Sequence, residues 1–130
     1  MGTTKPDPDV IILTGDLERR ARDADDALHD ALRRLGQAEL SLRRISEEAS
    51  QAAERASETD GDGDLERLGD RVLDRSRALL ALAAAEREAI SARKSLEIVT
   101  SHILHEAGLA ADGWRLDIGW RGGAPSLRRR

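Results

Sequence analysis

The residues with the clearest chemical potential in this 130-residue chain are two closely spaced histidines. His102 and His105 stand three residues apart and Glu106 follows, so a helix would present them near one face. Zinc requires three or four such ligands supported by a second layer of hydrogen bonds. The other histidine, His29, is expected several helical turns away. We therefore interpret His102 and His105 as polar residues at a helix C-terminus, where a cationic side chain is favourable.

An acidic, glycine-containing segment offers a second candidate site. Asp60, Asp62 and Asp64 alternate with glycines and could supply oxygen ligands to calcium. A calcium-binding EF-hand loop also needs glycine at its sixth position and a bidentate acid at its twelfth. Leu65 and Arg71 occupy those positions. The segment 59–63 is therefore interpreted as a turn, because aspartate and glycine tolerate left-handed backbone.

The sequence carries no recognisable catalytic motif. It contains no cysteine, no Gly-x-Ser-x-Gly, no phosphate-binding glycine loop and no His-Glu-x-x-His. Its many carboxylates are expected on solvated helix faces beside arginines. We expect no catalytic residue, no cofactor and no bound metal, and hence a protein that is not an enzyme.

The elements that must position these side chains are long helices. Residues 16–58 contain apolar residues whose steps alternate between four and three, and the average of 3.5 is the coiled-coil period. Leucine and alanine alternate along the middle of this row, which allows a second helix to approach closely. The row consists of Leu17, Ala21, Ala24, Leu28, Ala31, Leu35, Ala38, Leu42, Ile45, Ala49, Ala52 and Ala56.

Residues 64–108 predict a second helix with a broader apolar surface. Residues 78–85 are apolar on every side, which is typical of a helix buried on more than one face. Gly108, followed by apolar Leu109, is expected to end the helix. The expected contact with the first helix combines the row Leu65, Val72, Leu79, Glu86, Arg93, Thr100 and Ala107 with the row Leu68, Arg75, Leu82, Ala89, Leu96 and Ile103.

Two helices of similar length joined by a short turn should fold back antiparallel. The predicted fold is all-α: an antiparallel two-helix coiled-coil hairpin over 16–108, with its turn at 59–63. An extended arm over 1–15 and a Trp-containing segment with a basic tail over 109–130 lie at its open end. Pairing about the turn places Arg75 opposite Glu47 and Glu48.

The chain ends are expected to meet at this open end. Val10–Leu13 and Arg115–Trp120 should pair as two antiparallel strands, or lie as arms on another subunit. The tail is expected to be flexible, and its candidate phosphate contacts are Arg121, Arg128, Arg129 and Arg130. The net charge of the chain is -4. A solubilising end, or pairing of the tail with an acidic surface of a neighbouring subunit, is therefore preferred over nucleic-acid binding.

The predicted hairpin is poorly filled and should associate with a partner, because alanine buries little apolar area. Several apolar residues would stay exposed on a lone hairpin, namely Leu32, Leu40, Leu73, Leu80 and Ile98. Trp114 and Trp120, the only aromatic residues, either anchor an interface or cap the open end. The residues expected to contact partners are Val10, Ile11, Ile12, Leu13, Leu80, Trp114, Leu116, Ile118 and Trp120.

These features favour a non-catalytic structural or assembly protein that binds copies of itself or other subunits. Within this class, the more specific hypothesis is a small component of a phage or prophage virion. A regulatory or inhibitory protein that docks on a host complex, and a nucleic-acid accessory protein using the arginine tail, are the alternatives. No run of about 18 apolar residues and no basic-then-apolar leader occur. We expect a cytoplasmic or virion location, no membrane contact and no classical secretion.

Overall fold

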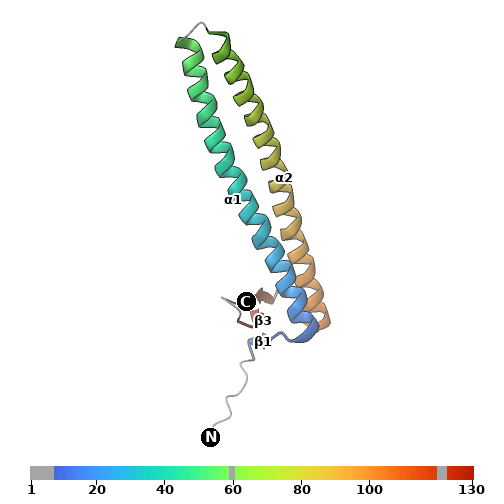
Figure 1. Cartoon of the computed structure of the whole chain (residues 1–130). Coiled ribbons are helices and arrows are strands. Elements are labelled where there is room, and N and C mark those ends of the chain that lie inside the picture. The colour runs from blue at the N-terminus through green and yellow to red at the C-terminus, as the bar shows by residue number, and fades with distance from the viewer. Residues whose placement is uncertain (1–7, 59–60, 120–122) are drawn as a thin grey trace. The chain divides into compact units, whose positions relative to one another are not determined.

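The computed structural model describes residues 8–58, 61–119 and 123–130. The chain forms two compact units: residues 1–29 with 91–130, called the sheet unit, and residues 30–90, called the hairpin unit. Helix accounts for 75% of the structure. The elements in chain order are β1 (Val10–Ile12), α1 (Gly15–Glu58), α2 (Asp62–Glu106), β2 (Trp114–Asp117) and β3 (Ser126–Arg129) (Figure 1).

In the hairpin unit, α1 and α2 pack side by side as an antiparallel pair, which confirms the predicted two-helix hairpin. Arg34 and Arg71 form ion pairs with Glu88 and Glu48 on the facing helix, at 3.3 and 3.4 Å. Arg75 Nε donates to Ser46 Oγ at 3.3 Å. The expected partners of Arg75 were Glu47 and Glu48, so the register predicted from the turn is correct to within two residues.

The apolar row predicted for α1 is confirmed. All of its positions are buried or half-buried, and Ala21, Ala31 and Ala49 are the most enclosed. The large residues off this row, Leu32 and Leu40, are exposed as predicted. A helix with its apolar residues on one side needs a single packing partner, and α2 supplies it.

The contact surface predicted for α2 is wrong in one of its two rows. Leu65, Val72 and Leu79 are exposed instead of facing α1. The row that faces α1 lies one residue earlier, with Ala78 and Ala85 buried and Ala92 and Val99 half-buried. Small side chains opposite the alanine-rich row of α1 let the two backbones come close, which favours this face over one with larger residues. The other predicted row holds at Leu68, Leu82, Ala89, Leu96 and Ile103, which are buried or half-buried.

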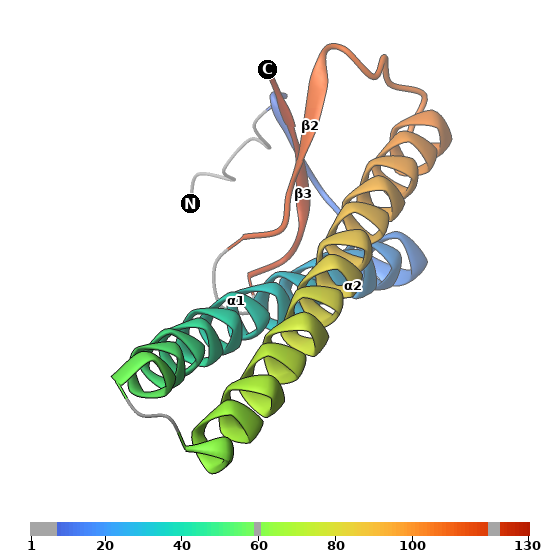
Figure 2. The same cartoon turned by 90° about the horizontal axis from the view of Figure 1, so that it is seen from above.

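The sheet unit contains a three-stranded antiparallel sheet in the order β1-β3-β2 (Figure 2). The predicted pairing of Val10–Leu13 with 115–120 is therefore wrong, because β3 lies between β1 and β2. The flexible tail is also wrong for residues 126–129, which form the central strand. Leu127 pairs with Ile11 on one side and Leu116 on the other, and it is fully buried. This cross-strand apolar row explains why a short basic segment joins the sheet.

The core of the sheet unit joins the sheet to the ends of both helices. Its buried residues are Leu13, Ala21, Ile103, Leu104, Trp114 and Leu127. Arg20 on α1 forms an ion pair with Glu106 on α2 at 3.0 Å, which links the two helices in this unit. Among the described residues, the large apolar side chains that are buried all lie in this core, whereas the buried residues of the hairpin unit are alanines.

The stop predicted at the end of α2 is confirmed. Gly108 has a φ of 71°, its N–H donates to the His105 carbonyl, and the Leu109 N–H donates to the Leu104 carbonyl. These two bonds define a Schellman cap, in which Leu109 also packs on the core that contains Leu104. At the other end, Asp62 and Gly63 belong to α2 instead of the predicted turn. Thr59 and Asp60 lie outside the described residues.

Candidate functional site

The strongest candidate site is an exposed apolar surface on α2 of the hairpin unit, which we call the outer face. Its large members are Leu65, Val72, Leu73, Leu79 and Leu80, and all five are exposed. Leu80 retains 72% of its accessible surface. Three small residues, Gly69, Ser76 and Ala83, lie between them. Ile90 lies at the far end of the face.

The outer face has the spacing of a helix-packing surface. Residues 65, 69, 72, 76, 79 and 83 are separated by alternating steps of four and three, and position 90 continues the row after Glu86. This is the period that brings a helix row against a partner helix. Clustered apolar residues on the surface of a soluble protein commonly mark an interaction site, whereas single ones need no explanation. The outer face therefore has both the composition and the period needed to bind another helix.

The sequence identified part of this face and misassigned the rest. Leu73 and Leu80 were expected to be exposed, and they are. Leu65, Val72 and Leu79 were assigned to the contact with α1. The signal that could have separated them is the second four-and-three row through Gly69, Ser76 and Ala83, which runs beside the row that packs on α1.

The contact residues predicted near the chain ends occupy different environments. Leu13 and Trp114 are buried in the core of the sheet unit, so this chain already covers them. Val10, Ile11, Leu116 and Ile118 are half-buried. Ile12 is exposed. Trp120 lies outside the described residues.

The arginines predicted as nucleic-acid contacts are engaged inside the sheet unit. Arg128 Nε lies 2.8 Å from Asp117 Oδ2, and Arg129 Nε lies 3.2 Å from Asp9 Oδ1. The Arg129 guanidinium also lies 5.0 Å from the centre of the Trp114 ring, within cation–π range. Arg130 Nε donates to the Trp114 carbonyl at 3.1 Å. Arg121 lies outside the described residues.

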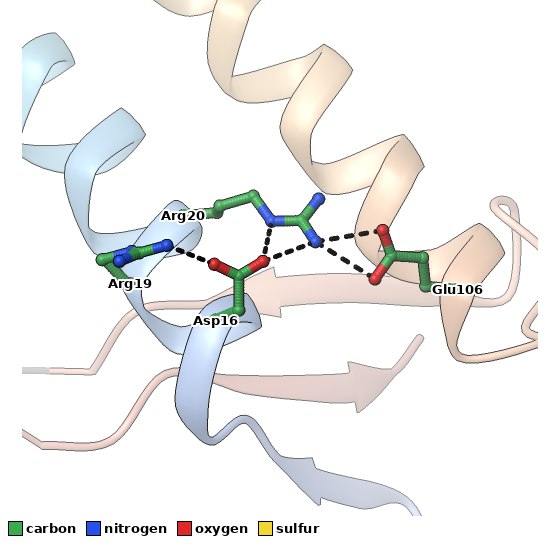
Figure 3. A network of polar contacts seen from close by, with 4 residues as sticks. All are labelled: Asp16, Arg19, Arg20 and Glu106. Carbon is green, nitrogen blue, oxygen red and sulfur yellow. Dashed lines mark hydrogen bonds and ion pairs between the residues drawn. The ribbon is translucent and has the colours of Figure 1, made fainter.

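A network of charges joins the start of α1 to the end of α2 (Figure 3). Asp16 accepts hydrogen bonds from Arg19 and Arg20, and Arg20 also donates to both carboxylate oxygens of Glu106 at 3.0 and 3.2 Å. The hydrogen bonds from Arg20 and then Arg19 lower the pKa of Asp16 below its ordinary value. The pKa of Arg20 is raised, first by Glu106 and then by Asp16. Asp16, in the first turn of α1, thus binds two arginines of its own helix.

A groove of about 610 Å³ opens on the surface of the sheet unit. Its walls include Asp25 and His29 of α1, Thr100 of α2 and Trp114 of β2. His29 Nδ1 lies 2.9 Å from the Asp25 carbonyl oxygen and 3.2 Å from Asp25 Oδ2. The Thr100 hydroxyl donates to the Leu96 carbonyl. Both polar groups are held by their own helices, as is usual for side chains on a helix surface.

Residues suggested as metal ligands are not brought into a cluster. His102 and His105 are exposed on the last turns of α2, and Glu106 is bound to Arg20. Across the described ranges, no group of three or more His, Cys, Asp or Glu side chains could hold a metal ion. In the same ranges, neither helix has a stretch apolar enough and long enough to span a bilayer.

Comparison with known proteins adds no relative. No family model, no curated protein and no solved structure matches this chain. Functional inference therefore depends on the surfaces of the molecule itself.

Proposed function

We propose that this protein is a non-catalytic assembly component that binds a partner helix through the outer face of α2. The observation that carries the proposal is the exposure of Leu65, Val72 and Leu79 in a helix-packing row, with Leu73 and Leu80 exposed beside it. Full burial of one leucine side chain contributes about 1.5–3 kcal/mol, so covering several of them would offset a substantial cost of association. In a lone hairpin these side chains stay exposed to water, so their burial contributes nothing to stability.

The setting of such a component is the second part of the proposal. A phage or prophage virion is the specific form we favour, since virion subunits act through protein contacts without catalysis. The same outer face would also serve a regulatory or inhibitory binder, the alternative class considered from the sequence. The identity of the bound partner separates these two settings: other structural subunits support the first, and a host enzyme or nucleoprotein complex supports the second.

Co-purification with matched variants tests the proposal. The tagged protein would be expressed in its source organism as the natural sequence, as Val72→Glu/Leu80→Glu and as the control Leu32→Glu/Leu40→Glu. Each variant introduces two glutamates at exposed apolar positions of the hairpin unit, on α2 and α1 respectively. Circular dichroism checks that both variants keep the helical content of the natural protein.

We expect the natural protein and the α1 variant to recover the same partners, and the α2 variant to lose them at least tenfold. Burying two new charges in an interface would cost more than the contact contributes. Recovery of the same partners by the α2 variant would overturn the proposal. Equal loss with the α1 variant would also overturn it, because the effect would then not be specific to the outer face.

A further inference from the structure

We propose that the outer face of α2 binds the same face of a second copy, with the two α2 helices antiparallel about a two-fold axis between positions 77 and 78. This inference rests on the proposed function and names the partner helix. All the residues that carry it lie in the hairpin unit, within residues 65–90. The argument uses the order of large, small and charged residues along the outer face.

The first argument is the match of large and small side chains. The row alternates between residues 65, 72 and 79 and residues 69, 76, 83 and 90. In an antiparallel pair, a residue of the first set faces a residue of the second set on the other copy. A two-fold between positions 77 and 78 places Leu65 opposite Ile90, Val72 opposite Ala83, and Leu79 opposite Ser76. The two layers nearest the axis thus combine one large and one small residue, which fills an interface evenly.

A parallel pair of the same faces would pack less well. Its layers would join identical residues, so that Ser76 would meet Ser76 and Ala83 would meet Ala83. Leu79 would meet Leu79 in the layer between them. Layers of two small residues leave voids beside layers of two leucines, and an unfilled void forfeits contact energy. The sequence of the outer face therefore favours the antiparallel arrangement.

The second argument is charge complementarity at the flank of the row. The flanking positions are Glu66, Leu73, Leu80 and Arg87, and all four are exposed. The same two-fold that aligns the core layers brings Glu66 within two residues of the level of Arg87 of the second copy, and Leu73 within two residues of the level of Leu80, which is within side-chain reach. An antiparallel dimer would contain each of these contacts twice. A single axis therefore pairs opposite charges at the two ends and leucines in the middle.

Gly69 gives a third argument. A glycine inside a helix costs about 1 kcal/mol relative to alanine. A Cβ built at Gly69 meets no atom within 4 Å, so packing inside this chain does not require the glycine. In the proposed dimer, Gly69 faces Glu86 of the second copy, in the layer next to Leu65 and Ile90. The missing side chain leaves room there for the aliphatic stem of the glutamate.

A charge-swap series measures the proposed contact in purified protein. Sedimentation equilibrium at low salt would compare the natural chain with Glu66→Arg, Arg87→Glu and the double variant. Each single change sets like charges against each other twice in the dimer, and we expect it to raise Kd roughly tenfold. The double variant restores opposite charges at both sites, and its Kd should return to within about threefold of the natural value. Circular dichroism confirms that all of the variants fold.

Cross-linking then tests the orientation, using the absence of natural cysteine in the chain. Leu65→Cys and Ile90→Cys, which the two-fold places opposite each other and far from their own copies, would be prepared separately and treated with a short bismaleimide, alone and mixed. The antiparallel dimer should give efficient cross-linking only in the mixture. Efficient cross-linking of either variant alone would overturn the antiparallel arrangement.

The outcomes separate this inference from the proposed function. A chain that stays monomeric at high micromolar concentration overturns self-pairing, and a double variant no tighter than the single variants overturns the proposed two-fold axis. In either case, the co-purification experiment still decides whether the outer face binds a different protein. If self-pairing is observed but Val72→Glu/Leu80→Glu does not disrupt it, then the second copy binds elsewhere and the outer face is not the self-pairing surface.

Discussion

The two helices are nearly equal in length, at 44 and 45 residues, but their apolar residues are distributed differently. In α1 the regular row lies on one side, which α2 covers, and the isolated Leu32 and Leu40 lie off it. In α2 the apolar residues lie around the whole helix, so contact with α1 leaves a second apolar face exposed. α1 thus has one continuous apolar face and α2 has two, and the second face of α2 is the basis of the proposed partner.

The largest expected effect comes from charging the covered side of α1. Leu35→Asp places a carboxylate against α2 and removes a leucine from the seam, and it should lower the free energy of unfolding by roughly 3–4 kcal/mol. The control Leu40→Asp makes the same change on the exposed side of the same helix and pays the same helix-propensity cost. We expect it to cost no more than about 1 kcal/mol. Urea unfolding followed by circular dichroism measures both, and equal losses would contradict the one-sided description of α1.

The sequence predicted α1 well because its signal is unambiguous. Only one face of that helix carries large apolar residues in a regular row, so burial could be assigned residue by residue. The stop at Gly108 was predictable for a similar reason, since glycine followed by an apolar residue matches the geometry of a Schellman cap. Predictions from local patterns that allow a single interpretation were therefore confirmed by the structure.

The sequence predicted α2 and the chain ends less well because their patterns have several interpretations. Rows beginning at Asp64, Leu65 and Leu68 all fit the coiled-coil period, and only packing against α1 selects among them. The strand β3 was missed because Ser126–Arg129 contains one apolar residue among polar ones, and one of its two partner strands, β1, lies more than a hundred positions away. The sequence therefore predicts only part of the outer face, because the side of α2 that α1 covers is known only from the structure.

An intermediate effect should distinguish the two sides of α2. Ala85 is buried and Ala84 is exposed, although they are neighbours in the sequence. Ala85→Leu adds three carbons where the helices approach closely, and the overpacking should cost about 1–3 kcal/mol of unfolding free energy. Ala84→Leu should change it by less than about 0.5 kcal/mol, since both residues are strong helix formers. Thermal unfolding of the two variants checks this, and a larger loss for Ala84→Leu would show that the wrong side of α2 has been assigned to α1.

The smallest expected effect concerns the charges that join the two helices in the sheet unit. Arg20 and Arg19 hold the pKa of Asp16 below its unfolded value of about 3.9. A carboxyl group with a lowered pKa in the folded state stabilises the fold above that unfolded value, and the contribution is lost as the pH falls through the folded pKa. Asp16→Asn should therefore lower Tm slightly at pH 7, and the difference from the natural protein should shrink progressively below about pH 4.

Salt provides the control for this last change. The side chains of Asp16, Arg20 and Glu106 are 54%, 37% and 46% exposed, so water and ions screen their interaction strongly. At about 1 M NaCl the Tm difference between Asp16→Asn and the natural protein at pH 7 should nearly vanish. A difference that persisted in high salt and at low pH would show that Asp16 stabilises α1 through the backbone at its first turn. In that case the arginine network would not be what joins the ends of the two helices.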